Sequence, residues 1–210
     1  MTLTFSREDF RLRCDELSSS DADLANIIRL HGYPPFWSRP PNFATLVHII
    51  LEQQVSLASA RAAIDHLRKR IRRITVENVL SLSDSELKDC YFSRQKIIYV
   101  RDLALRIKEG RLLLAQMNQC SDASIRQMLT QVKGIGDWTT DIYLLMALHR
   151  SDIFPLGDLA MVKSIRKVKK LETGCSPEAM LEIAAKWQPW RSVATMLLWH
   201  HYLMERKRKL

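Results

Sequence analysis

Asp158 is the carboxylate whose position in the sequence is best suited to chemistry. It follows the loop FPLGD (154–158), which contains a proline and a glycine, and it stands immediately before a predicted helix. An aspartate at that point can cap the helix through its side chain, which is a common structural role. It can also hold a negative charge where a reacting group needs one. The residues alone leave both roles open.

The segment MLTQVKGIGDWTTDIYLLMAL (128–148) holds a second group of residues with a recognisable use. Gly134 and Gly136 bracket Ile135 between two predicted helices, and glycine permits a positive φ and a close approach to the backbone. The amides that open the second helix point outward and favour an anion. Together with Lys133, this turn predicts a site for a phosphate backbone rather than for a base sequence. The alternative is a glycine turn that only joins two packed helices.

The overall charge favours a polyanionic partner. Lys and Arg number 32 against 23 Asp and Glu, which gives a formal net charge of +9. Nucleic acid is therefore the first candidate partner. The four cysteines lie far apart without a C-x-x-C pair, so we expect neither a disulfide framework nor a zinc site. We expect His200 and His201, which lack metal-ligand partners at suitable spacing, to pack or to form hydrogen bonds.

Composition is that of a globular protein, with 47% hydrophobic and 26% charged residues. The N-terminus carries charges throughout and lacks the apolar run of a signal peptide. No stretch reaches the ~20 apolar residues that a membrane span needs. We therefore expect a protein that is not secreted, and that lies in the cytoplasm at the nucleoid of a bacterium or in the nucleus of a eukaryote.

The elements that must position these residues are helices. Apolar residues recur at helical spacing, and no strand alternation competes, in the segments 43–54, 56–71, 94–110, 139–149 and 193–207. We therefore predict an all-α fold. Helix breakers divide the chain at 31–42, 133–136 and 154–158. We interpret them as marking two helical lobes, residues 42–150 and residues 1–41 plus 151–210, with a ligand-binding cleft between the lobes.

Three segments resemble one family in the same order along the chain. The first resemblance is that of V-K-G-I-G-D-W-T (132–139) to the helix-hairpin-helix motif of DNA repair proteins. The chain then continues with a helix, a Pro/Gly loop and an aspartate, and this order resembles that of the helix-hairpin-helix DNA glycosylase superfamily. ILEQQVS (50–56) and KWQPWRSVATMLLWHHY (186–202) are similar to its branch of 3-methyladenine DNA glycosylases of type II, which repair alkylation damage. The usual Gly-Pro-Asp of the loop reads Pro-Leu-Gly-Asp (155–158) here, which keeps the aspartate in register and alters the loop.

The resemblance implies a bilobal helix-hairpin-helix glycosylase fold and a monofunctional enzyme. Such an enzyme hydrolyses the N-glycosidic bond of alkylated purines, for example 3-methyladenine and 7-methylguanine, in base excision repair, with Asp158 as the catalytic carboxylate. Lyase-active relatives carry a lysine at the position of Trp138, so no Schiff base forms there and strand cleavage is not expected. The alternatives are a non-catalytic helix-hairpin-helix DNA-binding protein and a sister glycosylase for uracil, thymine or oxidised bases.

The resemblance also implies which residues bind. The expected partner is double-stranded DNA with a damaged base, bound by a monomer, and Gln54 fills the gap that the flipped base leaves. Lys163 adds a phosphate contact. No cofactor and no iron–sulfur cluster are expected, but a Na⁺ or K⁺ ion can bind the main-chain carbonyls of Thr130, Val132 and Ile135 at the hairpin. The base pocket implied here consists of Trp138, Trp199, Phe36, Trp37, Ile142 and His200. Relatives have aromatic residues at the position of Ile142 and near that of His200, so the pocket differs from theirs at these two places.

Overall fold

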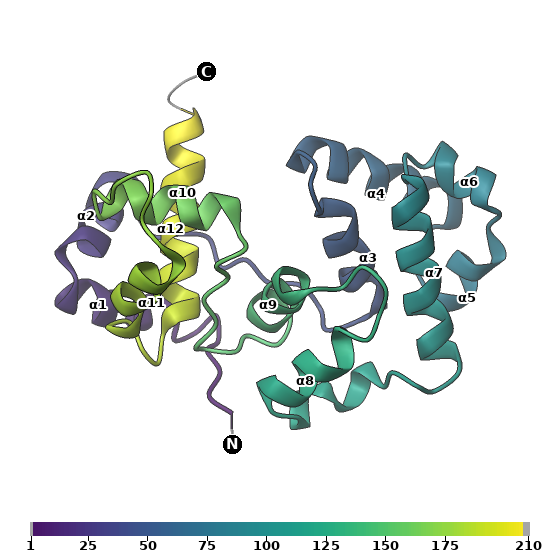
Figure 1. The fold of residues 1–210 in the computed structure, drawn as a ribbon, viewed down its shortest axis with the longest axis horizontal. Helices are drawn as coiled ribbons and strands as arrows, with labels where there is room; N and C mark the ends of the chain where they lie inside the picture. The colour runs from purple at the N-terminus through teal and green to yellow at the C-terminus, as the bar shows by residue number, and fades with distance from the viewer. Residues whose placement is uncertain (1, 208–210) are drawn as a thin grey trace. The chain divides into compact units, whose positions relative to one another are not determined.

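The computed structural model describes residues 2–207 of the 210-residue chain (Figure 1). Within that range the regular elements are helices, and one isolated bridge joins Thr4 to Arg150. The predicted all-α fold is therefore confirmed. Among the described residues, no helix combines the length and the apolar character needed to cross a membrane.

The described residues form two compact units, which we call the central unit (Arg39–Tyr143) and the terminal unit (residues 2–38 together with 144–207). The terminal unit contains α1 (Phe10–Ser20), α2 (Ala22–His31), α10 (Leu159–Val168), α11 (Pro177–Ala185) and α12 (Arg191–Lys207). The central unit contains α3 (Phe43–Glu52), α4 (Leu57–Ile71), α5 (Val76–Ser81), α6 (Asp84–Asp89), α7 (Arg94–Lys108), the 3₁₀ helix η1 (Leu114–Gln119) and α8 (Asp122–Leu129). The helix α9 (Asp137–Met146) begins in the central unit, and its last residues belong to the terminal unit.

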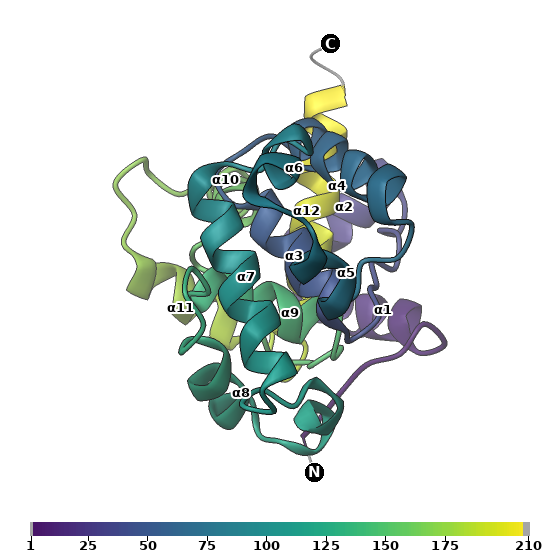
Figure 2. The same cartoon turned by 90° about the vertical axis from the view of Figure 1, so that its right-hand side faces the viewer.

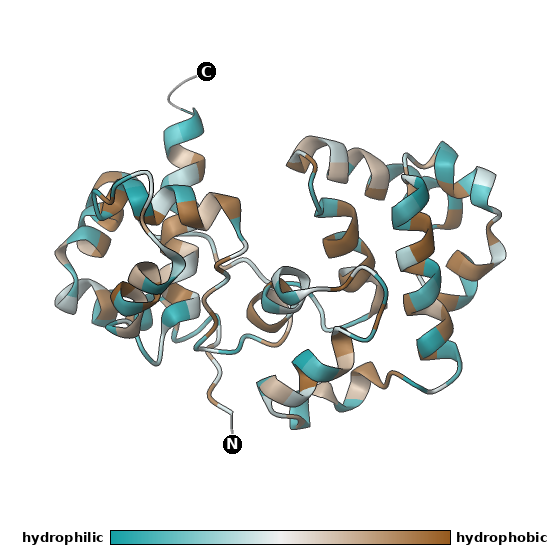
Figure 3. Ribbon diagram, in the orientation of Figure 1, coloured by the Kyte–Doolittle hydropathy of each residue, from teal (hydrophilic) through white to brown (hydrophobic). Residues whose placement is uncertain are grey.

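The core of the central unit lies around α3 and α7. Leu46, Ile49 and Ile50 of α3 and Val100 and Leu103 of α7 are fully buried. The two views in Figures 1 and 2 show α5 and α6 beside α7. In Figure 3, α7 shows hydrophilic and hydrophobic bands in alternation, which is expected of a helix with one buried side.

The terminal unit is assembled around α12, which packs against α1, α2 and α10. Val193, Met196, Leu197 and Leu198 of this helix are fully buried. A helix with neighbours on several sides is apolar on most of its surface. The dense apolar pattern of its sequence therefore reflects its place at the centre of the unit.

Polar side chains fix most of the helix starts. Asn42, Ser56 and Ser176 each accept a hydrogen bond from a backbone N–H inside the following helix. Ser83 and Glu86 form a reciprocal capping box at the start of α6. The predicted helix over 43–54 ends earlier than expected, because Gln53 has extended backbone angles and Gln54 has a positive φ of 55°.

Candidate functional site

Asp158 lies in the terminal unit as the N-cap residue of α10. Its Oδ1 accepts a hydrogen bond from the backbone N–H of Met161 at 2.8 Å and one from the indole N–H of Trp199 at 2.9 Å. The side chain therefore caps the helix and is also held by a side chain of α12. Both N–H groups and the positive end of the α10 dipole stabilise the ionised carboxylate. The result is a half-buried negative charge in a fixed position.

The loop that precedes α10 is fixed by the first residues of α12. The Ser192 hydroxyl accepts a hydrogen bond from the backbone N–H of Ile153 at 2.9 Å. Arg191 forms an ion pair with both carboxylate oxygens of Asp152, at 2.6 and 2.9 Å. Asp152 thus has a structural role, and the Arg-Ser pair positions the loop that leads to the capping aspartate.

Trp199, which donates to this carboxylate, is in turn in contact with Trp37. Trp37 and Trp199 are half-buried and meet edge to face, with ring centroids 6.3 Å apart and an interplanar angle of 75°. The Trp37 ring is also tilted against His200 at 6.5 Å. The terminal unit therefore brings Asp158 and two of the predicted pocket aromatics together.

The remaining predicted pocket residues of the terminal unit lie in packed surroundings. The Phe36 ring contacts the rings of Phe5, Phe10 and His149, with centroid distances of 5.8, 5.3 and 5.1 Å. His200 is 8% exposed, and its Nε2 lies 3.0 Å from the carbonyl oxygen of His31. In this structure both residues support the segments that carry the two tryptophans.

The central unit holds the glycine turn and the first part of α9. Gly134 has a φ of +78°, and a Cβ placed on it would lie 2.1 Å from Cδ2 of Tyr99. Gly134 thus has the positive φ that glycine permits, and its close neighbour is the Tyr99 ring of the protein itself, so the approach of a DNA backbone to this turn stays a prediction. Gly136 has neither property, because a Cβ there would meet nothing within 4 Å. Ile135 is 4% exposed and packs as a buried apolar residue.

Two side chains that the sequence analysis missed support this turn. The amide nitrogen of Gln53 donates hydrogen bonds of 2.8 Å to the Gly134 carbonyl and to the hydroxyl of Thr139. A carboxylate oxygen of Asp102 accepts the backbone N–H of Lys133 at 2.9 Å. Burial raises the pKa of Asp102, but hydrogen bonds from Lys133 and Arg106 outweigh it and lower that pKa. Asp102 lies on α7, and Gln53 lies at the end of α3. The Gln-Gln pair (53–54) was the signal in the sequence for Gln53, whereas Asp102 had none.

The main-chain carbonyls of Thr130, Val132 and Ile135 lie at the end of α8 and in the turn that follows it. Thr130 is the C-cap of α8, where helix carbonyls lack partners within the helix. The Val132 carbonyl accepts the Ile135 N–H at 3.1 Å and retains a second lone pair. Three carbonyl oxygens form a donor set that suits a hard cation such as Na⁺ or K⁺.

Gln54 is an exposed residue in the turn between α3 and α4. Its neighbours Val55 and Leu57 are 45% and 64% exposed. The turn therefore presents a polar side chain beside two apolar ones. The sequence predicts a role for Gln54 and carries no signal for the exposed apolar pair.

The other predicted residues divide between the two units. Trp138 is half-buried in the first turn of α9, and Ile142, one turn later, is 4% exposed. Lys133 is exposed in the central unit, whereas Lys163 is exposed on α10 in the terminal unit. Lys163 also borders a shallow pocket of about 180 Å³ between α10 and α12.

A match to a protein-family model identifies the family to which this chain belongs. Residues 47–189 match the model of the HhH-GPD superfamily base excision DNA repair proteins. The chain belongs to the HhH-GPD superfamily. The match extends from α3 through the glycine turn to the residues just before α12, so it covers both the turn and Asp158.

Individual relatives are similar in sequence to this chain over different shares of its length. YfjP of Bacillus subtilis (strain 168) is 32% identical over 123 residues, which are 59% of this chain and 43% of YfjP. The chain thus spans less than half the length of that relative. The Schizosaccharomyces pombe protein named DNA-3-methyladenine glycosylase 1 is 25% identical over 190 residues, or 87% of this chain and 83% of the relative.

A solved HhH-GPD structure has the same fold. The 3-methyladenine DNA glycosylase Mag1 of Schizosaccharomyces pombe, in complex with abasic DNA, superposes with a TM-score of 0.79 at 25% identity. The match covers 89% of this chain and 94% of Mag1. The order of helices predicted from the sequence is therefore that of a known glycosylase fold.

Proposed function

We propose that this protein is a DNA glycosylase that hydrolyses the N-glycosidic bond of alkylated purines in base excision repair. The observation that carries the proposal is the Asp158 carboxylate, which is held by the Trp199 indole and the Met161 amide beside a pair of tryptophans. Membership of the HhH-GPD superfamily and the similarity to proteins named DNA-3-methyladenine glycosylases support it.

A single carboxylate suffices for this reaction when the base is already cationic. Alkylation of a ring nitrogen gives the purine a positive charge, so the base leaves as a neutral heterocycle without a general acid. The C1′–N bond breaks, its electron pair goes to the base, and an oxocarbenium-like sugar remains. Asp158 stabilises this cation electrostatically, and a water molecule adds to C1′ and loses its proton. The fixed hydrogen bonds to Asp158 avoid reorganisation as charge develops.

The aromatic pair supplies recognition of the same charge. A delocalised cation over an indole face gains roughly 0.5–2 kcal/mol, depending on how far it is desolvated. Trp199 contacts the carboxylate and Trp37 contacts Trp199, both in the terminal unit, and Trp138 of the central unit is a further candidate for base contact. This preference for a cationic base distinguishes alkylated purines from uracil, thymine and oxidised bases.

The glycine turn is proposed to bind the DNA backbone. The exposed Lys133, the outward amides at the start of α9 and a Na⁺ or K⁺ ion on the turn carbonyls would supply positive charge for a phosphate. Lys163 would add a second phosphate contact. In the same proposal the exposed Gln54 enters the duplex and fills the gap that the flipped base leaves.

Base release from duplexes that contain a single 7-methylguanine or 3-methyladenine tests the proposal. Asp158→Asn keeps the size of the side chain and removes its charge, and we expect base release to fall by about 100- to 1,000-fold, as for loss of an electrostatic stabiliser. Binding of the variant to abasic DNA should remain. Glu172→Gln removes an exposed carboxylate of the same unit and serves as the matched control. Unchanged release by Asp158→Asn would show that Asp158 is a cap and nothing more.

The same assay separates the competing functions. A wild-type protein that binds DNA and releases no base from any lesion would be a non-catalytic hairpin protein. Faster release from uracil, thymine or 8-oxoguanine duplexes than from alkylated ones would identify a sister glycosylase. Because Trp138 replaces the lysine of lyase-active relatives, we expect abasic product without strand cleavage and no borohydride-trapped adduct with DNA.

A further inference from the structure

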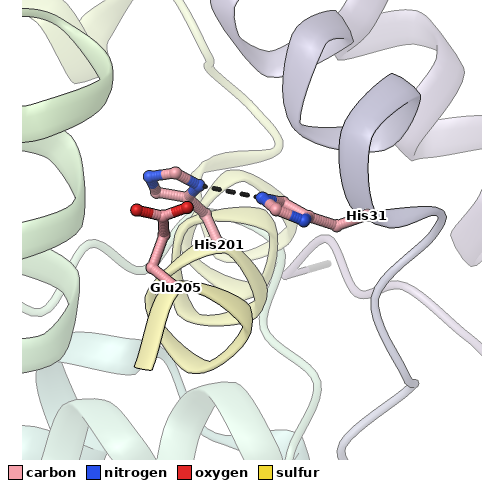
Figure 4. A group of neighbouring side chains, drawn as sticks. All are labelled: His31, His201 and Glu205. Carbon is pink, nitrogen blue, oxygen red and sulfur yellow. Dashed lines mark hydrogen bonds between the residues drawn. The ribbon is translucent and has the colours of Figure 1, made fainter. Parts of the chain in front are cut away.

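His31, His201 and Glu205 form a cluster of potential metal ligands in the terminal unit, as Figure 4 shows. His31 is the last residue of α2, and the other two residues come from α12. One ligand atom from each side chain lies within 4.8 Å of the other two. The sequence analysis assigned no metal partner to His201, because His31 is remote in the chain.

The distance between the two imidazoles fits a shared metal ion. His201 Nδ1 lies 3.3 Å from His31 Nε2. The two nitrogens form a long hydrogen bond, since the usual N–H hydrogen bond is about 2.9–3.0 Å (Figure 4). Their separation matches the edge of a tetrahedron around zinc, which is about 3.3 Å when the Zn–N bonds are about 2.0–2.1 Å. The two nitrogens therefore have the spacing of two ligands on one metal ion, which would replace their hydrogen bond once the rings turn toward it.

The helices bring the third ligand to the same place. His201 and Glu205 are four residues apart on α12, so their side chains lie on one face of the helix. The Glu205 side chain is 23% exposed and can rotate toward the two rings. His31 is held in place at its backbone, because its carbonyl oxygen contacts Nε2 of the buried His200. The end of α2 also carries the negative end of a helix dipole, which favours a cation.

Basic residues near the cluster act against a cation. Lys167 pairs with Glu205, and Lys163 and Arg206 border the same pocket. The Lys167 side chain is 60% exposed, so it can turn into solvent, and an ion pair that exposed contributes little to stability. Lys167 therefore competes with a metal ion for Glu205 without blocking the site.

We propose that His31, His201 and Glu205 bind a divalent ion of the zinc class, with water as the fourth ligand. Two imidazoles and one carboxylate are a donor set that zinc accepts. The ion links the end of α2 to α12, two helices that lie far apart in the chain, and so stabilises the folded terminal unit. The site does not depend on the proposed glycosylase activity.

Tag-free protein, purified in the presence of a chelator, provides the test. Addition of Co²⁺ should produce the intense visible absorption of a tetrahedral site, and Zn²⁺ should displace it and raise the melting temperature. A near-ultraviolet thiolate-to-cobalt band would instead place the ion on one of the cysteines and overturn the proposal. So would Co²⁺ that stays octahedral, or Zn²⁺ that leaves the melting temperature unchanged.

Three substitutions locate the ion. His31→Gln and Glu205→Gln should each weaken Zn²⁺ binding by more than about 10-fold, since loss of a ligand exceeds loss of an outer-shell partner. Lys167→Met should tighten binding by about 2- to 5-fold, because it frees Glu205 from its ion pair. His66→Gln, in the central unit beside Tyr91, should leave binding unchanged. A loss of binding in the control, or weaker binding in Lys167→Met, would contradict the assignment.

Discussion

At the scale of single residues, the hydrogen bond from Trp199 to Asp158 is the contact most specific to the proposed chemistry. It joins α12 to the start of α10 and directs an N–H group at the carboxylate that is to face a developing positive charge. A hydrogen bond to a charged acceptor contributes about 1.5–3 kcal/mol. The orientation of Asp158 therefore depends on a tryptophan that the sequence analysis assigned to the base pocket alone.

Trp199→Phe removes this donor and keeps most of the ring. We expect kcat for release of 7-methylguanine to fall by about 10- to 100-fold, which is the loss of one such bond in the transition state. Single-turnover base release measures the effect. Trp190→Phe is the matched control, because Trp190 lies in the same unit under the Arg13 side chain. A Trp199→Phe enzyme as fast as the wild type would mean that the Met161 amide alone orients Asp158.

The sequence predicts Asp158 and Trp199 as site residues through their resemblance to one family, and Trp37 through its place in the proline-rich stretch; these assignments stay predictions. The sequence did not predict their contacts. The Asp158–Trp199 bond joins two helices, and the packing of Phe36 on Phe5 and Phe10 depends on a fold that brings the chain start back to the proline-rich segment. Pairing between distant side chains leaves no periodic pattern in a single sequence.

At the scale of elements, the glycine turn between α8 and α9 depends on one of its two glycines. Gly134→Ala would place a Cβ on a positive φ and against the Tyr99 ring, whereas Gly136→Ala meets open space. A left-handed conformation costs an alanine roughly 1–2 kcal/mol before the clash is counted. We expect urea denaturation to show a loss of at least that size for Gly134→Ala and almost none for Gly136→Ala.

Binding of abasic DNA, followed by fluorescence anisotropy, should weaken in Gly134→Ala because the turn moves. Equal stability of the two alanine variants would contradict the requirement for glycine at position 134. Adding Tyr99→Ala to Gly134→Ala should recover the part of the loss that is due to the clash and leave the part that is due to φ. If Gly134→Ala costs as much in the Tyr99→Ala background as in the wild type, the whole effect belongs to the backbone.

The helices themselves were largely predictable, whereas their ends were less so. The predicted segments 56–71 and 94–110 correspond to α4 and α7, since amphipathic spacing and serine caps act locally. The segment 43–54 was predicted too long, because the hydrogen bonds of Gln53 to the distant Gly134 and Thr139 stabilise an extended backbone at the end of α3. A tertiary contact set that boundary.

At the scale of the whole molecule, the terminal unit must hold together segments from both ends of the chain. Asp21 is a central contact in this assembly. Its carboxylate caps α2, accepts two bonds of 2.6 and 2.7 Å from Lys169 at the end of α10, and accepts the indole N–H of the buried Trp187 at 2.8 Å. Three segments of the unit thus meet at one charge.

The stability of the terminal unit should depend on pH through this carboxylate. Burial raises the pKa of Asp21, but the bonds from Lys169 and Trp187 outweigh it and lower the pKa below its ordinary 3.8. The stabilisation is therefore complete only above about pH 5, well above the unfolded-state pKa, and is lost as pH falls through 3.8 toward the lowered folded-state pKa. Asp21→Asn should cost about 1.5–3 kcal/mol in urea denaturation at neutral pH. The difference from wild type should shrink at pH values below the ordinary 3.8, where the unfolded carboxylate is protonated while the folded one still resists protonation. Asp23→Asn, whose carboxylate also contacts Lys169 but is 49% exposed, should cost much less. A difference for Asp21→Asn that is the same at both pH values would show that its contribution is independent of charge.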